Sequence, residues 1–223
     1  MKPGYKQTEV GVIPEEWEVL PAREIGAFRG GNGFPLTAQG GTTGAYPFFK
    51  VSDMNNEGNE IFMTSANHRI SEQTRKRLGA TAFPAESIVL AKVGAAIFLE
   101  RKKILNQPSC LDNNMAAYVL DKSRADVRFV HTLLLSKKLG ALVATTALPA
   151  LNGKQLGEML LSLPPLPEQR AIATALIDVD GLLGALDRLI AKKRDLKQAA
   201  MQQLLTGQTR LPGFKGEWVV KTF

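Results

Sequence analysis

The sequence has few of the residues that bind metals or form disulfides. Its 223 residues include one cysteine, Cys110, and two histidines, His68 and His131. A single cysteine excludes an intrachain disulfide framework and suits a reducing cytoplasm. No histidine is near Cys110 in the sequence, so we interpret it as a small buried or semi-buried residue rather than a nucleophile. The two histidines lie far apart without metal-ligand spacing, and we expect each at the surface or partly buried.

Long hydrophobic runs are also missing. No apolar stretch reaches the roughly 18 residues that a membrane span requires. The first residues, MKPGYKQTEV, are polar and lack the apolar run of a signal peptide. These absences predict a cytoplasmic protein without a membrane partner. The apolar fraction of 44% is nevertheless sufficient for a hydrophobic core.

Catalytic motifs are absent as well. The sequence contains no CxxC, HExxH or GxSxG pattern. Its one Pro-Pro pair stands in SLPPLP, without the preceding Asn and following aromatic residue of an adenine methyltransferase. Glu86 and Lys92 lie on one expected strand, but no partner acid completes a magnesium site. We therefore predict a non-catalytic protein with no metal or cofactor of its own.

Acidic residues are in the minority. The chain carries 28 Lys and Arg against 21 Asp and Glu, a formal net charge of +7. This balance permits nucleic-acid binding without being specific for it.

One long helix is predicted over residues 164–207. Three prolines, Pro164, Pro165 and Pro167, end the preceding element, and Pro167 suits a first helical turn. No further proline occurs between Pro167 and Gly207. Gly207 suits the left-handed cap at the end of a helix. At about 1.5 Å per residue this helix is roughly 50–60 Å long, the length of a spacer rather than an ordinary core helix.

The predicted helix carries apolar stripes and divided charge. Apolar residues recur at sevens, and those expected to face a partner helix are Ile172, Leu176, Val179, Leu183, Leu186, Ile190 and Leu204. Acids dominate before position 188 and bases after it, so an antiparallel pair of copies places opposite charges together. Gly181 and Gly184, each costing about 1 kcal/mol in a helix, suit a close crossing near the middle. The alternative is a terminal helix packed on its own domain.

Residues 1–163 are predicted to form one α+β domain with a mixed or antiparallel sheet. Strands are expected at 46–51 and within 83–120, and helical spacing covers 125–143. Ser71 is expected to cap a helix beginning at Glu72. We expect residues 26–45 to form a glycine-rich loop without the GxxxxGK[ST] phosphate motif, 53–59 a polar turn, and 152–154 a tight exposed turn.

Two tryptophans stand in loosely similar surroundings. Trp17 follows Pro14 and Trp218 follows Pro212, each preceded by Glu and followed by a short apolar stretch. Trp17 is the expected anchor of an N-terminal arm. The loose match indicates that residues 208–223 begin a second copy of the domain.

Several segments together resemble one known family. They are YKQTEVGVIPEEWEV, YPFFKVSDM, ESIVLAKVGA, NQPSCLDNNMAAYVL and LPALNGKQLGEMLLSLPPLPEQRAIATAL. They resemble the DNA-specificity subunit of type I restriction-modification systems over nearly the whole chain, most specifically at PPLPEQRxIA. Such subunits normally hold two target recognition domains, each followed by a conserved helix. This chain has one of each, so we expect a half-size subunit, either natural or truncated.

The resemblance implies sequence-specific binding of double-stranded DNA without catalysis. Each recognition domain of the family reads one half of a bipartite target, and paired helices fix the gap between the halves. Methyltransferase subunits bind the helices and supply S-adenosylmethionine, while restriction (motor-nuclease) subunits, with their ATP and Mg²⁺, join for cleavage. A half-size subunit restores this layout as an antiparallel homodimer reading an inverted repeat. The alternative is a helix-mediated adaptor that does not read DNA.

The residues expected to contact DNA are loop polar residues and cations. Lysine, arginine and small polar side chains suit phosphates, whereas Asn, Gln, Arg and Lys suit base edges. The candidates are Thr42, Thr43, Lys50, Ser52, Asn55, Arg75, Arg77, Lys92, Arg101, Lys102, Asn113, Asn114, Asn152 and Lys154. For the Arg75–Arg77 cluster, a solvated helix face is an equal alternative.

Overall fold

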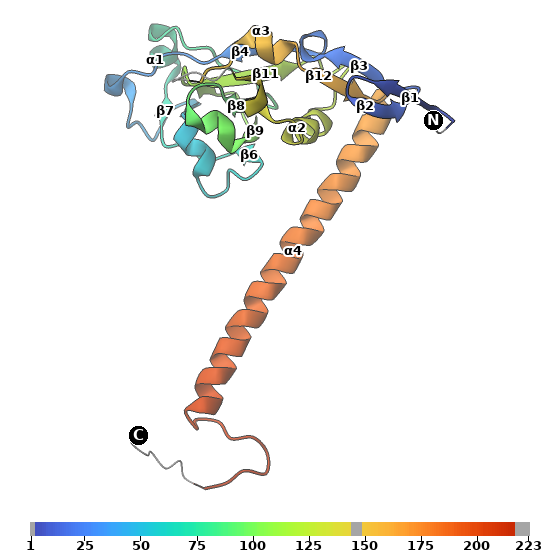
Figure 1. Cartoon of the computed structure of the whole chain (residues 1–223). Coiled ribbons are helices and arrows are strands. Elements are labelled where there is room, and N and C mark those ends of the chain that lie inside the picture. Colours follow the sequence, from blue (N-terminus) through green and yellow to red (C-terminus); the bar gives the residue numbers. More distant parts are fainter. Residues whose placement is uncertain (1–2, 144–148, 217–223) are drawn as a thin grey trace. The chain divides into compact units, whose positions relative to one another are not determined.

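The protein is described by a computed structural model in which residues 3–143 and 149–216 are placed. Contacts divide the chain into two units, Met1–Ala173 and Thr174–Phe223. Figure 1 shows the element order along the chain. Trp218, which the sequence analysis compares with Trp17, lies outside the described residues.

A five-stranded mixed sheet forms the centre of the first unit (Figure 1). In spatial order its strands are β4 (Gly26–Gly30), β11 (Met115–Leu120), β8 (Ile88–Ala91), β9 (Lys102–Leu105) and β6 (Phe62–Met63). All neighbours pair antiparallel except β9 and β6, which are parallel.

Three smaller sheets surround this one. In the first, β5 (Tyr46–Phe49) pairs in parallel with β10 (Cys110–Leu111) and antiparallel with β7 (Arg69–Ile70). The other two are antiparallel pairs: β1 (Tyr5–Thr8) with β2 (Gly11–Pro14), and β3 (Glu18–Pro21) with β12 (Leu160–Leu163). These sheets, with the long C-terminal helix, confirm the predicted α+β class.

The helices of the domain are short and capped by side chains. They are α1 (Glu72–Arg77), α2 (Val127–Leu135) and α3 (Gly153–Gly157). Ser71 accepts a hydrogen bond from the Thr74 amide, as predicted for its cap, and Asp126 caps α2. Five 3₁₀ segments complete the described part: η1 (Ala22–Glu24), η2 (Leu36–Ala38), η3 (Val51–Asn55), η4 (Ala95–Leu99) and η5 (Leu139–Leu142).

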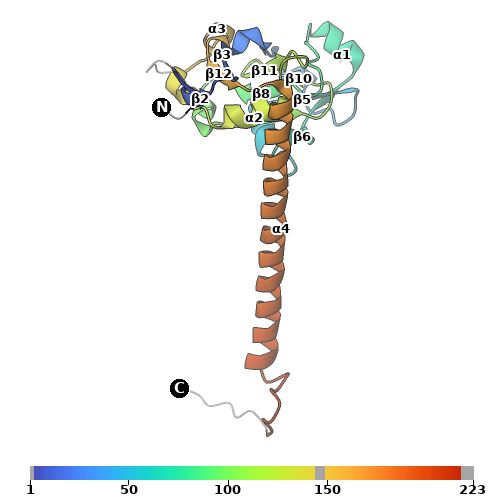
Figure 2. The ribbon, with the colours of Figure 1, turned by 90° about the vertical axis from the view of Figure 1, so that its right-hand side faces the viewer.

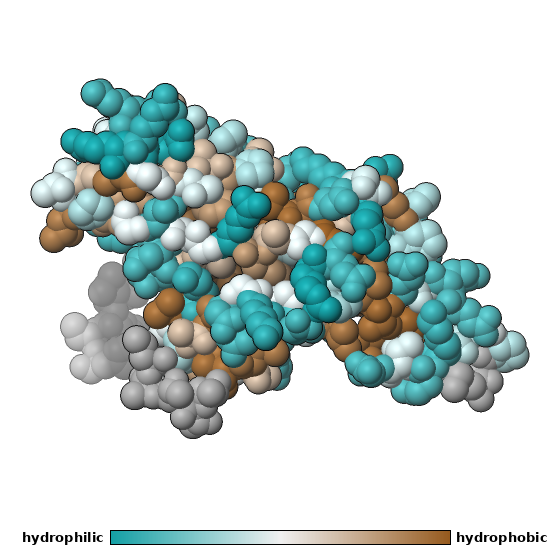
Figure 3. Space-filling view, turned by 90° about the horizontal axis from the view of Figure 1, so that it is seen from above, coloured by the Kyte–Doolittle hydropathy of each residue, from teal (hydrophilic) through white to brown (hydrophobic). Residues whose placement is uncertain are grey.

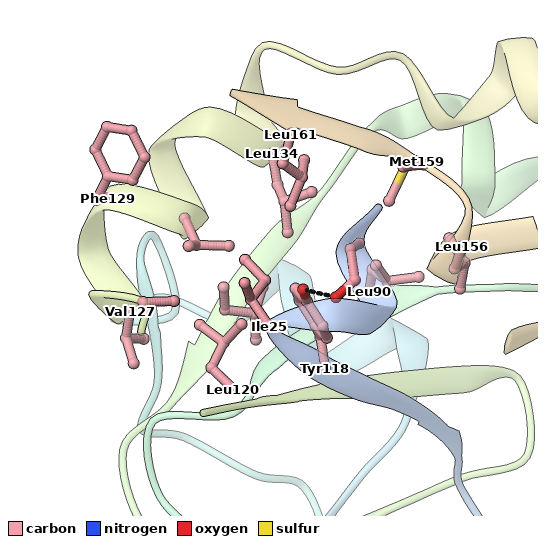
Figure 4. Close-up of a cluster of buried hydrophobic side chains, with 14 of the residues drawn as sticks. Ile25, Leu90, Tyr118, Leu120, Val127, Phe129, Leu134, Leu156, Met159 and Leu161 are labelled. Carbon is pink, nitrogen blue, oxygen red and sulfur yellow. Dashed lines mark hydrogen bonds between the residues drawn. The ribbon is translucent and has the colours of Figure 1, made fainter. Parts of the chain in front are cut away.

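Side chains alternate along each strand, so every strand of the central sheet contributes to both faces, and apolar clusters bury both faces. On β11, Ala116 and Tyr118 face one apolar cluster, whereas Met115 and Ala117 face another. Tyr118 is fully buried, and its hydroxyl donates a hydrogen bond to the carbonyl oxygen of Ala22 (Figure 4). Its ring stacks on Phe28 with 4.0 Å between centroids. Each face of β11 therefore has its own core.

Several local predictions are wrong. Residues 26–30, expected within a loop, form strand β4, and residues 95–99, expected within a strand, form η4. The predicted turn at 152–154 is the start of α3, where Asn152 and Gln155 form a reciprocal capping box. His131, expected at the surface or partly buried, is 5% exposed and bonds through Nε2 to the Lys102 carbonyl at 2.9 Å.

The prediction for Cys110 is confirmed. Its side chain is fully buried beside Phe48 and Ile70. Burial raises the pKa of the Cys110 thiol to about 11, because the thiolate is poorly solvated there. The thiol therefore stays protonated at neutral pH.

The predicted long helix is also confirmed. Helix α4 runs uninterrupted from Leu166 to Leu205 (Figure 2). Pro167 lies in its first turn, and Gly207 has a φ of 74°, the left-handed cap expected from the sequence. The Thr209 amide donates to the Gln203 carbonyl at 3.0 Å, which closes the helix end. In the part of the chain that the structure describes, no helix combines the length and the apolar character needed to cross a membrane.

Candidate nucleic-acid interface

Four strand termini meet at one end of the central sheet, where the strands begin or stop, rather than along an outermost strand. The antiparallel register pairs Gly30 with Ala116, Ala91 with Met115, and Leu90 with Lys102. The ends of β4 and β8 therefore lie beside the beginnings of β9 and β11. We call this end of the sheet the strand-end edge.

Several candidate DNA-contacting residues meet at the strand-end edge. The Lys92 amide donates to the Asn114 carbonyl, and the Leu151 amide donates to the Lys92 carbonyl, both at 2.8 Å. These bonds bring Lys92, Asn113, Asn114 and Asn152 together. The Lys92 side chain extends over Gly30, where a Cβ atom would lie 3.4 Å from its Nζ. Glycine at position 30 therefore leaves room for the lysine.

Lys50 joins this edge through Asp112. The Asp112 amide donates to the Phe49 carbonyl at 2.9 Å, next to Lys50, and its carboxylate accepts from the Asn114 amide at 3.0 Å. Burial raises the pKa of Asp112, while hydrogen bonds from Asn114 and, to a smaller extent, the nearby Lys50 charge oppose that rise. The Lys50 ammonium also bonds to Gln39 Oε1 at 3.1 Å.

The exposed candidates Ser52 and Asn55 lie on η3, which two buried polar residues hold in place. Asp53 accepts from the Lys50 amide at 2.6 Å and from the Asn67 amide at 3.2 Å. Asn59 donates to the carbonyls of Asp53 and Ser65, each at 2.7 Å. The sequence indicated only a polar turn here. The available sequence signal was the Asp and the Asn at the two ends of this turn, since such residues often hydrogen-bond to nearby backbone.

Asn152 and Lys154 are exposed at the start of α3, which packs over β4. A Cβ atom on Gly153 would lie 3.2 Å from the Phe28 carbonyl oxygen, so the glycine permits close approach to β4. Helix α3 therefore adds one cation and one amide beside the strand-end edge.

Thr42 and Thr43 are exposed on the loop before β5. Arg69 holds this loop against β7: its amide donates to the Gly41 carbonyl at 2.6 Å and its guanidinium to the Gly44 carbonyl at 2.9 Å. This hydrogen bonding fixes both ends of the threonine pair.

Arg75 and Arg77 differ in what they can contact. The Arg75 guanidinium makes two bonds to the Glu72 carboxylate, at 2.7 and 2.8 Å, and one to the Ala80 carbonyl at 2.8 Å. It lies 5.6 Å from the Tyr46 ring centroid. Arg75 is therefore engaged within the fold, whereas Arg77 is exposed.

We expect the Arg75–Glu72 pair to make stability depend on pH. The hydrogen bond from Arg75 lowers the pKa of Glu72 from 4.5 to about 2. A depressed carboxyl pKa stabilises the fold above the unfolded value, and that contribution is lost as pH falls from 4.5 towards 2. Glu72→Gln should lower the thermal midpoint at neutral pH, with the difference from wild type shrinking in acid. The exposed Glu9→Gln serves as control, and a difference that persists undiminished in acid contradicts this assignment.

Lys102 corrects one prediction, and Arg101 beside it is half-buried. The Lys102 side chain has no exposed surface; its Nζ bonds to Glu100 Oε2 at 2.6 Å and to the Lys137 carbonyl at 2.8 Å. Lys102 thus cannot reach DNA in this arrangement, because alternation along β9 directs it into the core.

The predicted helix-pairing residues divide into two groups. Ile172 packs against the domain core and Leu204 is half-buried beside the turn after α4, so neither is freely available to a partner helix. Leu176, Val179, Leu183, Leu186 and Ile190 are exposed.

The PEQR motif has a structural explanation. Gln169 is buried: its Oε1 accepts from the Asp126 amide at 2.8 Å, and its Nε2 donates to the carbonyls of Arg124 at 3.0 Å and Pro164 at 2.9 Å. The neighbouring Glu168 accepts from the Trp17 indole at 3.2 Å, which anchors the N-terminal arm. Gln169 therefore joins the first turn of α4 to the domain.

The face of the molecule seen in Figure 3 is mainly polar. Seen from above, hydrophilic side chains cover much of the visible face, with separate hydrophobic patches between them (Figure 3). Among residues 3–143 and 149–216, no group of three or more His, Cys, Asp or Glu side chains is arranged to hold a metal ion.

Comparison with known families gives a decisive match. The model of the type I restriction modification DNA specificity domain matches residues 14–192. The chain belongs to this family. It is 26% identical over 218 residues to the type I restriction enzyme MjaVIII specificity subunit of Methanocaldococcus jannaschii, covering 93% of this chain and 49% of the relative.

Solved structures show the same fold for this specificity domain. A chain from a structure describing assembly and conformational transition of the type I R-M system superposes with a TM-score of 0.67 at 17% identity, covering 91% of this chain and 47% of that one. The HsdS subunit from Thermoanaerobacter tengcongensis gives 0.62 at 17% identity, covering 90% and 47%. The chain spans about half the length of the curated relatives it matches.

Proposed function

We propose that this specificity domain is the non-catalytic DNA-recognition part of a type I restriction-modification complex, reading one half of a bipartite target. Residues 1–163 act as the recognition domain, residues 164–207 as the spacer helix, and residues 208–223 as the start of a further domain. The observation that carries the proposal is the gathering of Lys50, Lys92, Asn114 and Asn152 at the strand-end edge of a domain of this family.

The composition of this edge fits duplex DNA. Lysines there suit phosphates, while the amides of Asn113, Asn114 and Asn152 can bond adenine edges in the major groove. Backbone pairing holds the main chain that carries these side chains, which favours affinity because little ordering entropy is lost on binding. Ser52, Asn55 and Lys154 extend the same surface, and Thr42, Thr43, Arg77 and Arg101 are peripheral members.

Helix α4 would serve as the docking element for methyltransferase subunits. The restriction subunit would join through the complex, and S-adenosylmethionine, ATP and Mg²⁺ would belong to these partners. The support is the row of exposed apolar side chains on α4.

The same helix supports an antiparallel homodimer. Leu183, Leu186 and Ile190 are 54%, 45% and 47% exposed, consistent with a surface awaiting a partner helix. A Cβ atom on Gly181 would meet nothing within 4 Å, so no contact among the described residues requires glycine there. Close approach of a second helix explains it. A two-fold dimer would read an inverted repeat.

We expect the variant Lys50→Ala/Lys92→Ala/Lys154→Ala to lose about 100-fold in affinity for duplex DNA at physiological salt. Each lost phosphate contact removes about one unit from the slope of log affinity against log salt, so the slope should fall by about three. Fluorescence anisotropy of the full chain with a duplex selected from a random-sequence pool measures both quantities.

A matched control removes the same charge elsewhere. Lys122→Ala/Lys193→Ala/Lys215→Ala replaces three exposed lysines outside the strand-end edge and should change affinity little. If the two triple variants weaken binding equally, the interface is misplaced. If the wild-type chain binds a methyltransferase subunit but no duplex even with that partner present, the exposed apolar helix would instead favour an adaptor.

A further inference from the structure

The connection between β8 and β9 presents two large apolar side chains to solvent. Phe98 and Leu99, at the end of η4, are 56% and 57% exposed. The connection begins at Lys92 and ends at Arg101, just before β9, so it emerges from the strand-end edge itself. Such a pair at a polar edge calls for an explanation beyond core packing.

The turn that carries this apolar pair is fastened rigidly. Glu100, in the left-handed conformation with a φ of 55°, accepts from the amides of Leu139 and Gly140, each at 2.9 Å, and from Lys102 Nζ at 2.6 Å. The Phe98 ring packs so closely on η5 that a Cβ atom on Gly140 would lie 2.7 Å from it. The pair of half-buried Glu100 and buried Lys102 therefore acts as a clamp that positions Phe98 and Leu99.

The surroundings of the pair are cationic. Lys92 and Arg101 lie in the same connection, Lys137 and Lys138 directly precede η5, on which Phe98 packs, and residues 127–143 contain no acid. Glu100 is the one acid between positions 92 and 103, and the clamp uses its carboxylate. Exposed apolar side chains surrounded by positive charge are more complementary to a polyanion with an apolar interior than to an apolar groove on a protein. Duplex DNA, with charged backbones around stacked bases, has this composition.

We propose that Phe98 and Leu99 form a wedge that enters a DNA groove and inserts between two base pairs when the strand-end edge binds its target. This role rests on the proposed function. Apolar wedges of Phe or Leu unstack a base step and bend the duplex, and the bend brings more backbone within reach of flanking cations. The cost of unstacking depends on the step, so the wedge adds selectivity at a position that no polar side chain touches.

The test uses the full chain and a duplex selected by it from a random-sequence pool. Copies of that duplex carry 2-aminopurine at successive positions, because its fluorescence rises when a base unstacks. Wild type should raise the signal at one step. Phe98→Ala/Leu99→Ala should abolish the rise and weaken binding about 10-fold or more, with the salt slope unchanged. About half of each side chain is exposed, so the thermal midpoint should fall only slightly, through loss of the Phe98 contact with η5.

Three companion variants separate the explanations. Val12→Ala removes an exposed apolar group elsewhere and should behave as wild type. Lys92→Ala should reduce the salt slope but keep the fluorescence rise, and Phe98→Leu should keep most of it. Wild-type affinity and fluorescence in the double variant would overturn the wedge and leave the proposed function intact. If the double variant keeps its affinity and fluorescence with DNA but loses binding to a co-expressed methyltransferase subunit, the wedge is overturned in favour of a protein contact. Failure of the wild type to bind any duplex would instead refute the proposed function.

Discussion

Replacing Leu183, Leu186 and Ile190 with aspartate is expected to halve the solution mass of the protein, from about twice 24.2 kDa to a single copy. Each of these side chains contributes about 1.5–3 kcal/mol of hydrophobic stabilisation when a partner helix buries it. Removing three of them and placing three carboxylates in the seam should weaken the dimer by more than about 1,000-fold. Light scattering behind size-exclusion chromatography measures the mass.

The matched control is Gln198→Asp/Gln202→Asp/Gln203→Asp, which adds the same charge to the same helix without removing an apolar side chain. It should remain dimeric. All six positions are exposed in the single chain, so neither variant should disturb the domain. A wild-type monomer would show that α4 awaits a methyltransferase subunit or a second recognition domain. In that case the antiparallel argument from its charges is wrong.

Gln169→Met is expected to destabilise the domain by about 3 kcal/mol, because three backbone groups, one buried and two part-buried, lose their partners at about 1–3 kcal/mol each. These groups are the Asp126 amide and the carbonyls of Arg124 and Pro164. Methionine has nearly the same volume, so the loss reports hydrogen bonding rather than a cavity. For a chain of this size the thermal midpoint should fall by roughly 10 °C.

The control lies one residue away. Glu168→Ala removes an exposed carboxylate that accepts a hydrogen bond from the Trp17 indole, and it should cost less than about 1 kcal/mol. A midpoint for Gln169→Met equal to that of Glu168→Ala would contradict the structural explanation of the PEQR motif.

Elements decided by short-range signals were predicted well. Proline at the start, glycine at position 207 and heptad spacing were sufficient for α4, and Ser71 was sufficient for the cap of α1. In each case the determining groups lie within a few residues of each other, so the chain carries the information locally.

Strand β4 shows why other elements could not be predicted. Its sequence, GAFRG, has low strand propensity, and it becomes a strand because β11 offers it a pairing edge. Gly26 is needed there since a Cβ atom would lie 2.7 Å from the Tyr118 ring, a contact between residues ninety-two positions apart. Nothing within 26–45 signals this.

The candidate interface divides in the same way. The sequence alone determined which residue types could contact DNA, the long helix with its apolar stripes, and the family resemblance that the comparison then confirmed. Only the tertiary structure decided that Lys50, Lys92 and Asn114 meet at one edge while Lys102 is buried against Glu100. The reason is physical: a lysine is available to a phosphate only where folding leaves its ammonium group accessible to solvent, and the Lys102 side chain has no exposed surface.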